Sequence, residues 1–116
     1  MDGKEIVNIE LECADLCKKL KTPPFSTKIL NHENIEELKT FEQAIKKTKK
    51  MKGKLDYGVM FFMYLTYEDN TQKKYTLNVE DEDGRTALLV DTSASGQGYI
   101  IPEEQTNEIR KIIYSK

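Results

Sequence analysis

The sequence predicts an α+β fold of two layers, in which helices pack on an antiparallel meander sheet. Two observations favour this class. Several apolar or alternating segments follow one another with short turns between them, which favours antiparallel pairing. Two further stretches have the spacing of amphipathic helices, one in the first half of the chain and one at its end. We expect the order β-β-α-β-β-β-β-α with about five to six strands, forming a single domain over residues 1–116.

Size and composition support one small globular domain. The chain has 116 residues, of which 38% are hydrophobic and 33% are charged, and a disordered chain is rarely so apolar. The formal net charge is −2, which excludes a globally basic nucleic-acid binder, so no nucleic-acid partner is expected. The chain lacks an apolar run of about 18 residues, so we predict no transmembrane segment. We expect no cofactor and no metal.

The first strand is expected at residues 4–12, where β-branched residues stand among polar ones. The same stretch also fits a helix with apolar residues spaced over 6–20. Pro23 and Pro24 break regular structure after it, because neither can donate a backbone hydrogen bond. A short extended segment at 25–30 follows as the second strand.

A long helix is predicted to open with Asn34 in the cap position. Glu37 stands three residues later, which is the spacing of a capping box. Acidic residues lie in the first turn and lysines in the last turns, as the helix dipole favours, and Gly53 is placed as the stop. One apolar stripe runs along the helix through Ile35, Leu38, Phe41, Ala44, Ile45 and Thr48.

The segment Tyr57–Tyr67 is predicted to be a central strand covered on both sides, because both of its alternating faces carry apolar or aromatic residues. A turn at 68–71 joins it to a strand at 73–80, so the two form an antiparallel hairpin. The remaining expected elements are strands at 86–90 and 99–101 and a terminal helix that starts at Pro102 and turns Ile109, Ile112 and Ile113 inward.

The two cysteines, Cys13 and Cys17, are too few for a disulfide framework and lack a second ligand pair for zinc. On a helix their spacing would place both side chains on one face, but the segment fits better as the end of a strand. We therefore expect two structural thiols, with a disulfide between Cys13 and Cys17 as the less favoured alternative.

The segment Leu88–Ala94 is similar to the catalytic segment of retroviral-type aspartic proteases, in which two aspartates share a proton. Only 25 residues follow Asp91, which is too short for the flap hairpin that such proteases place after their catalytic loop. A turn that leaves a strand explains the segment better. We predict that the chain is not an enzyme, and an aspartic-type hydrolase through Asp91 remains the alternative.

Charge is strongly segregated along the chain. Residues 18–54 hold eleven lysines and four glutamates, a net charge of +7, whereas residues 1–17 carry −4 and residues 55–116 carry −5. Such a cluster can meet phosphates, an anionic membrane surface or an acidic protein. As a solvated helix end that complements the helix dipole, the cluster needs no partner, and this is the favoured explanation of the charge alone. The candidate binding residues are Lys46, Lys47, Lys49, Lys50, Lys52 and Lys54.

The segment Ile35–Asp56 resembles small extracytoplasmic domains of Gram-positive lipoproteins, called YhfM-like. Three features carry the resemblance, which covers residues 25–113: a Phe-x-x-Ala-Ile pattern at 41–45, a basic helix end, and Gly-x-x-Asp at 53–56. The chain departs from that pattern after Asp56, where Asp-Pro-Tyr-like residues are expected. The resemblance implies a membrane-tethered domain without an established activity, and it offers no catalytic residues to carry over.

Two functional hypotheses follow. The first is a non-enzymatic binding domain, the soluble part of a bacterial surface lipoprotein, whose lysine-rich helix end contacts an anionic lipid, a surface polymer or an acidic protein. The alternative is a cytosolic adaptor or immunity-type inhibitor that binds a protein through an exposed sheet face. The first residues lack the features of a signal peptide. The location is therefore extracytoplasmic and membrane-anchored if an export signal was removed, and cytoplasmic otherwise. We expect a monomer or a weak dimer.

Overall fold

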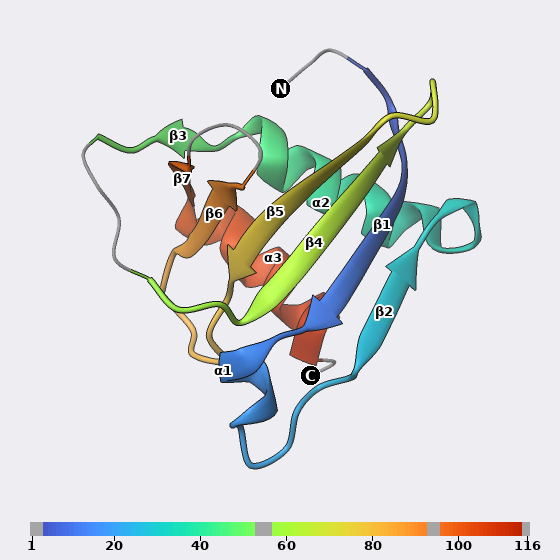
Figure 1. Ribbon diagram of the computed structural model, residues 1–116. Helices are drawn as coiled ribbons and strands as arrows, with labels where there is room; N and C mark the ends of the chain where they lie inside the picture. Colours follow the sequence, from blue (N-terminus) through green and yellow to red (C-terminus); the bar gives the residue numbers. More distant parts are fainter. Residues whose placement is uncertain (1–3, 53–56, 93–95, 115–116) are drawn as a thin grey trace.

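Seven strands form one antiparallel sheet within residues 4–52, 57–92 and 96–114, which the computed structural model describes (Figure 1). Helices α2 and α3 lie side by side on one face of this sheet, so the two-layer α+β prediction is confirmed. The elements in chain order are β1 (Ile6–Cys13), α1 (Asp15–Lys18), β2 (Thr27–Leu30), the 3₁₀ turn η1 (His32–Asn34), α2 (Ile35–Lys46), β3 (Lys49–Lys50), β4 (Phe61–Tyr67), β5 (Gln72–Asn78), β6 (Ala87–Asp91), β7 (Gln97–Ile101) and α3 (Glu103–Tyr114).

The strands are hydrogen-bonded in the order β2-β1-β4-β5-β6-β7-β3. β4 to β7 form the expected meander, in which each strand pairs with the next one along the chain. β1 lies between β2 and β4, with Ile9 opposite both Leu30 and Leu65. The additional strand is β3, which pairs with β7 at the edge of the sheet and lies where the sequence predicts the end of a helix.

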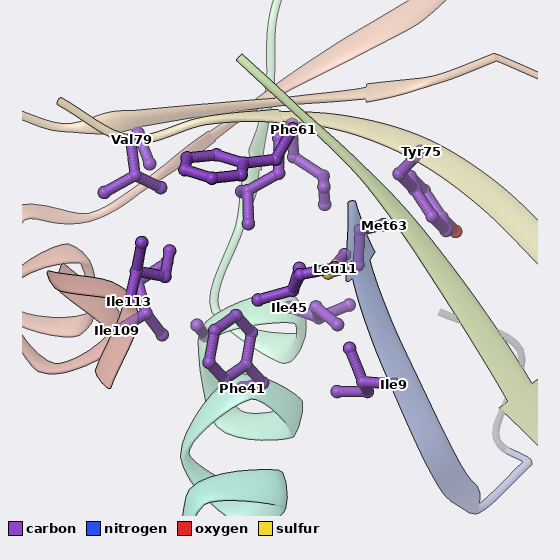
Figure 2. Packing of buried hydrophobic residues seen from close by; sticks show 14 of the residues in the cluster. Ile9, Leu11, Phe41, Ile45, Phe61, Met63, Tyr75, Val79, Ile109 and Ile113 are labelled. Atoms are coloured by element: carbon purple, nitrogen blue, oxygen red, sulfur yellow. The ribbon is translucent and has the colours of Figure 1, made fainter. Parts of the chain in front are cut away.

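The core lies between the sheet and helices α2 and α3 (Figure 2). Every second residue of the central strands points toward the helices, and burying each large apolar side chain contributes about 1.5–3 kcal/mol. The strands supply Ile9, Leu11, Phe61, Met63, Leu65, Leu77 and Leu89, and the helices supply Leu38, Phe41, Ala44, Ile45, Ile109 and Ile113. Within the described ranges, no helix is both long enough and apolar enough to cross a lipid bilayer.

The prediction that the segment Tyr57–Tyr67 is a strand covered on both sides is wrong. The strand begins at Phe61, and its residues alternate between buried and half-buried. Its second face stays open because α2 and α3 both lie on the other side of the sheet (Figure 1). The residues before it are held in place by Asn78, which accepts a hydrogen bond from the Met60 N–H at 2.8 Å and donates one to the Gly58 carbonyl at 2.7 Å.

The expectation of two free thiols is also wrong, because Cys13 and Cys17 form a disulfide. The strand ends at Cys13, and the chain then folds into the short helix α1, which contains Cys17. This change of direction brings the two Cα atoms to 5.4 Å, within the range of a disulfide. The bond is buried and ties α1 to the end of β1.

The capping box predicted for Asn34 and Glu37 is not formed, and Asn31 and Asn34 form one three residues earlier. The side chain of Asn31 accepts from the Glu33 N–H at 2.9 Å, and the side chain of Asn34 accepts from the Asn31 N–H at 2.7 Å. Both contacts enclose the turn η1, which leads directly into α2. The predicted stop at Gly53 lies outside the described residues.

Helix α3 is fastened to the sheet by polar side chains. Thr106 is buried, and its hydroxyl donates to the Ile101 carbonyl at 2.9 Å and accepts from the Ala87 N–H at 3.0 Å. As predicted, the helix starts directly after Pro102. These contacts fix the position of the helix at its first turn.

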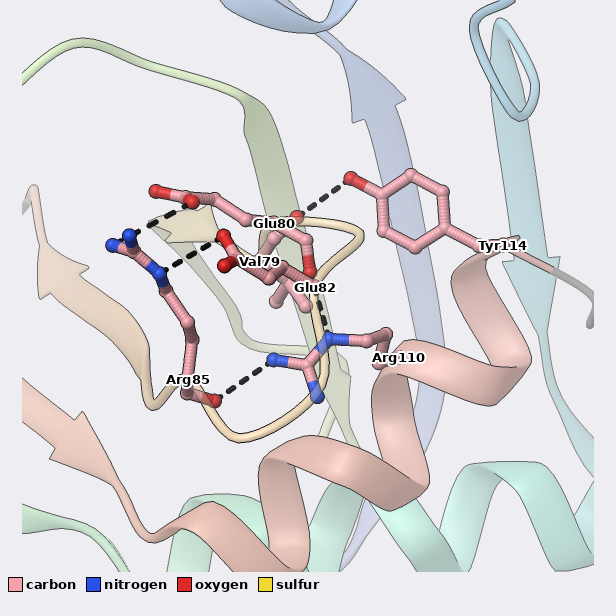
Figure 3. Close-up of polar contacts among 6 residues, drawn as sticks. All are labelled: Val79, Glu80, Glu82, Arg85, Arg110 and Tyr114. Carbon is pink, nitrogen blue, oxygen red and sulfur yellow. Dashed lines mark hydrogen bonds and ion pairs between the residues drawn. The ribbon is translucent and has the colours of Figure 1, made fainter.

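At the other end of α3, Arg110 and Tyr114 reach the turn between β5 and β6 (Figure 3). The buried guanidinium of Arg110 donates to the carbonyls of Glu80 at 2.7 Å and Arg85 at 2.8 Å, and also to the side chain of Asn107. The Tyr114 hydroxyl donates to the Val79 carbonyl at 2.6 Å, and its burial raises the pKa of Tyr114 to about 12.

Candidate functional site

The sequence predicted that the lysine run forms the end of a helix. In the structure the run instead crosses from the end of α2 to the edge of the sheet. Lys46 is the last residue of α2, and Lys49 and Lys50 form β3. Beyond the helix, the Thr48 hydroxyl and N–H both donate to the Ile45 carbonyl, at 2.9 Å and 3.4 Å. Lys54 lies outside the described residues. We call the other five residues the lysine edge: Lys46, Lys47, Lys49, Lys50 and Lys52.

Backbone pairing with β7 fixes the middle of the lysine edge. Lys49 lies opposite Ile100 and Lys50 opposite Tyr99. The Met51 N–H donates to the Gly98 carbonyl at 3.0 Å, and the side chain of Gln97 donates to the Met51 carbonyl at 2.8 Å. The two lysines of β3 therefore project from a backbone that is held on one side by the sheet.

The side chains of the two lysines in β3 point to opposite faces of the sheet. Successive residues of a strand point to opposite faces, so Lys49 lies on the open face of the sheet with Ile100, which is 36% exposed. Lys50 lies on the helix-covered face with Tyr99. The lysines thus spread around the edge of the sheet, an arrangement that suits an extended anionic surface better than a small ligand.

The positive charge of the lysine edge is largely uncompensated. All five lysines are exposed. Of these five, only Lys46 has an acidic partner among the described residues, namely Glu42, with 3.9 Å between Nζ and Oε1. Such an exposed pair contributes little to stability. The other glutamates of the basic block, Glu33, Glu36 and Glu37, lie at the opposite end of α2.

Asp91, the candidate residue of the hydrolase alternative, lies at the end of β6 and is buried. Its carboxylate lies 3.8 Å from the Lys73 ammonium, and Tyr75 is its neighbour across the strand pair. The arrangement is an ion pair on the helix-covered side of the sheet. The absence of enzymatic activity stays a prediction.

The open face of the sheet is a second exposed surface, which we call the outer face. Lys74 lies over two aromatic rings of β4, with its Nζ 4.1 Å from the Phe62 centroid and 5.6 Å from the Tyr64 centroid. The Tyr64 hydroxyl donates to Glu12 Oε1 at 3.1 Å, and desolvation together with this carboxylate raises the pKa of Tyr64. These contacts order the charged side chains on the outer face.

A hollow of about 470 Å³ opens beside the outer face, where β1 ends. Its walls come from β1, α1, the loop that leads into β2 and the first residue of β2. They are formed by Glu12, Cys13, Lys18, Pro23, Phe25, Ser26 and Thr27. The sequence did not indicate this site, because two thiols were expected where the Cys13–Cys17 disulfide ties α1 to the end of β1. The Pro23-Pro24-Phe25 run was the one available signal. Within the part of the chain that the structure describes, no group of three or more His, Cys, Asp or Glu residues could hold a metal ion.

A family model described as "YhfM protein" matches residues 19–116. This range contains the lysine edge and most of the sheet, whereas β1 and α1 precede it. No curated protein and no solved structure matches the chain.

Proposed function

The chain belongs to the YhfM family, and from this premise we propose that it is a non-enzymatic binding domain whose lysine edge contacts a phosphate-bearing anionic surface. We further propose that it is the soluble part of a membrane-tethered surface lipoprotein of a Gram-positive bacterium. Lipid head groups and phosphate-containing surface polymers share the chemistry that the lysines would meet. The observation that carries the proposal is the set of exposed lysines beside the β3–β7 pair, of which only Lys46 has an acidic partner among the residues that the structure describes.

The expected affinity follows from the number of free charges. A lysine near an anionic membrane contributes about 1 kcal/mol, so four contribute about 4 kcal/mol, which corresponds to a Kd of roughly 1 mM. Such binding is useful where the anionic groups are concentrated on a surface. Lysine acts as a hydrated point charge and does not require a fixed bidentate geometry. The spread of the lysine edge around the sheet is consistent with this mode.

The test compares vesicles of phosphatidylglycerol, vesicles of phosphatidylcholine and soluble poly(glycerol phosphate). The variant changes Lys46, Lys47, Lys49 and Lys50 to Gln. A matched control removes four exposed lysines elsewhere, with Lys19, Lys21, Lys39 and Lys111 changed to Gln.

We expect the wild type and the control to bind at least one anionic probe and the lysine-edge variant to lose that binding. The vesicle and polymer measurements identify which source of phosphate is recognised. The proposal fails if the wild type binds neither anionic probe, or if the lysine-edge variant binds as well as the control does.

A competing explanation of the lysine edge is protection of the sheet. Lysines on an edge strand discourage pairing with a strand of another molecule. If that is their whole role, the lysine-edge variant self-associates, and the wild type binds no anionic probe. Light scattering during size-exclusion chromatography separates the two explanations and also tests the expectation of a monomer or weak dimer.

The outer face supports a second candidate function, a cytosolic adaptor or immunity-type inhibitor that binds one protein. The supporting observation is a row of neighbouring residues across three strands, in which Ile29, Glu10 and Tyr64 lie opposite one another and Ile29 is 49% exposed. A partner captured by the wild type and by the lysine-edge variant, but lost on Ile29→Lys, would support this function. A partner that still binds Ile29→Lys would contradict it.

A further inference from the structure

We propose that the hollow at the end of β1 binds a small zwitterion with an apolar body, either a free apolar amino acid or a short peptide. Its volume of about 470 Å³ lies within the range of roughly 300–1,000 Å³ that is typical of small-molecule sites. The hollow lies on the β2–β1 side of the sheet, and the lysine edge lies at the opposite side. The proposal therefore does not depend on the function proposed above.

The walls of the hollow are held in place by bonds within the protein. The Cys13 N–H donates to the Ser26 carbonyl at 2.9 Å, which joins the strand to the loop. The disulfide with Cys17 ties α1 to the same strand, and the Leu16 N–H donates to the Val59 carbonyl at 2.9 Å. A site with walls fixed in this way loses little conformational entropy when a ligand binds.

One side of the hollow is apolar. Pro23 and Phe25 provide this surface, and the ring of Phe25 packs against Phe61 with 5.6 Å between the centroids. Contact with Phe61 connects Phe25 to the hydrophobic core. The hydroxyls of Ser26 and Thr27 lie beside this surface and can hydrogen-bond a ligand.

Two opposite charges line the same hollow without neutralising each other. Glu12 and Lys18 are both exposed, and among the described residues neither forms an ion pair with the other or with a third group. The Tyr64 hydroxyl donates to Glu12 Oε1 at 3.1 Å and orients the carboxylate. Lys18 is the last residue of α1, which the disulfide holds.

This pair of charges selects the ligand class. A ligand with an ammonium group beside Glu12 and a carboxylate beside Lys18 satisfies both side chains, while its apolar part packs on Pro23 and Phe25. A simple anion is repelled by Glu12, and a simple cation is repelled by Lys18. A molecule that carries both charges is therefore favoured over either ion.

The experiment is a titration of the ¹⁵N-labelled protein, followed by amide chemical shifts, with phenylalanine and with the dipeptide alanyl-phenylalanine up to about 20 mM. We expect shifts at the amides of residues 12–13, 18 and 25–27. The two probes distinguish a free amino acid from a peptide. N-acetylphenylalanine lacks the ammonium group and phenylalanine amide lacks the carboxylate, so each should bind about tenfold more weakly than phenylalanine.

Substitutions assign each charge. Glu12→Gln keeps an acceptor for Tyr64 and should weaken binding of phenylalanine about tenfold without weakening that of N-acetylphenylalanine. Lys18→Gln should weaken binding of phenylalanine to a similar extent without weakening binding of phenylalanine amide. The control variants Glu10→Gln and Lys21→Gln, which remove the same charges outside the hollow, should bind phenylalanine as the wild type does.

Three results would overturn the proposal. The first is that neither zwitterion shifts the amides that line the hollow. The second is that the singly charged analogues bind as tightly as phenylalanine. The third is that Glu12→Gln and Lys18→Gln, shown to be folded by well-dispersed amide spectra, bind phenylalanine like their control variants.

Discussion

Lys49 lies opposite Ile100 in an antiparallel pair of strands at the edge of the sheet. The lysine-rich segment around it has the composition of a solvated helix end, yet it forms the strand β3. The pair is supported by Gln97, whose side chain donates to the carbonyls of Met51 at 2.8 Å and Gly98 at 2.9 Å. The position of the lysine edge therefore depends on one amide side chain of β7 as well as on the backbone.

Gln97→Ala should loosen the lysine edge without unfolding the protein. The lost hydrogen bond to Met51 contributes about 1 kcal/mol, which corresponds to roughly fivefold faster hydrogen exchange at the Met51 amide. Amides of β4 should keep their protection and serve as the internal control. Unchanged exchange at Met51 would show that the backbone pairing alone holds the strand.

Removing the disulfide should lower the free energy of unfolding. The cysteines are separated by 4 positions, and for so short a loop the chain-entropy model gives a contribution of about 2 kcal/mol. We expect the double variant Cys13→Ala with Cys17→Ala to lose at least this amount in urea denaturation, and reducing agent to destabilise the wild type but not the variant. Two titratable thiols in the oxidised native protein would contradict the disulfide.

Arg110 should be one of the most sensitive polar positions. Arg110→Met removes the donors of the Glu80 and Arg85 carbonyls, and we expect a loss of about 3 kcal/mol in urea denaturation. The control is Arg85→Gln, which breaks only exposed ion pairs with Glu80 and Glu82 and keeps the Arg85 carbonyl. It should cost less than about 1 kcal/mol. Equal losses in the two variants would refute the role given to Arg110.

Tyr114 should make stability depend on pH in alkaline solution. Its pKa is raised from 10.0 to about 12 in the folded state, so the folded protein favours the protonated phenol. This contribution is complete below about pH 10 and is lost as the pH rises from 10 toward 12. Tyr114→Phe should cost about 1 kcal/mol at pH 8, and at pH 11.5 this cost should vanish or reverse, because the wild type then loses the contribution of its raised pKa; urea denaturation at both values measures the change. A difference between wild type and variant that does not change with pH would contradict the raised pKa.

The sequence predicts those elements whose signals are local. The apolar stripe of α2, the alternation in β5 and the proline before α3 each follow from the spacing of neighbouring residues, and the structure contains all three. The family resemblance is likewise confirmed over most of the chain. Local periodicity was therefore sufficient for the fold class.

The features that the sequence did not predict depend on contacts between distant residues. β3 forms because Ile100 lies beside Lys49, and no spacing within the lysine run indicates this partner. The outer face is open because both long helices lie on one side of the sheet. The alternation of residues in β4 does not indicate on which side the helices pack. The hollow lies beside the Cys13–Cys17 bond and the turn at α1, whereas the spacing of apolar residues favoured the end of a strand for this segment.

The most direct measurement of the proposed function is the salt dependence of binding to the anionic probe. Each lysine that neutralises a phosphate releases counterions, so the logarithm of the binding constant falls with the logarithm of the salt concentration. We predict a clear negative slope for the wild type and for the variant with Lys19, Lys21, Lys39 and Lys111 changed to Gln. The slope should be close to zero, or the binding undetectable, when Lys46, Lys47, Lys49 and Lys50 are changed to Gln. Equal slopes for the two variants would contradict the assignment of the anion site to the lysine edge.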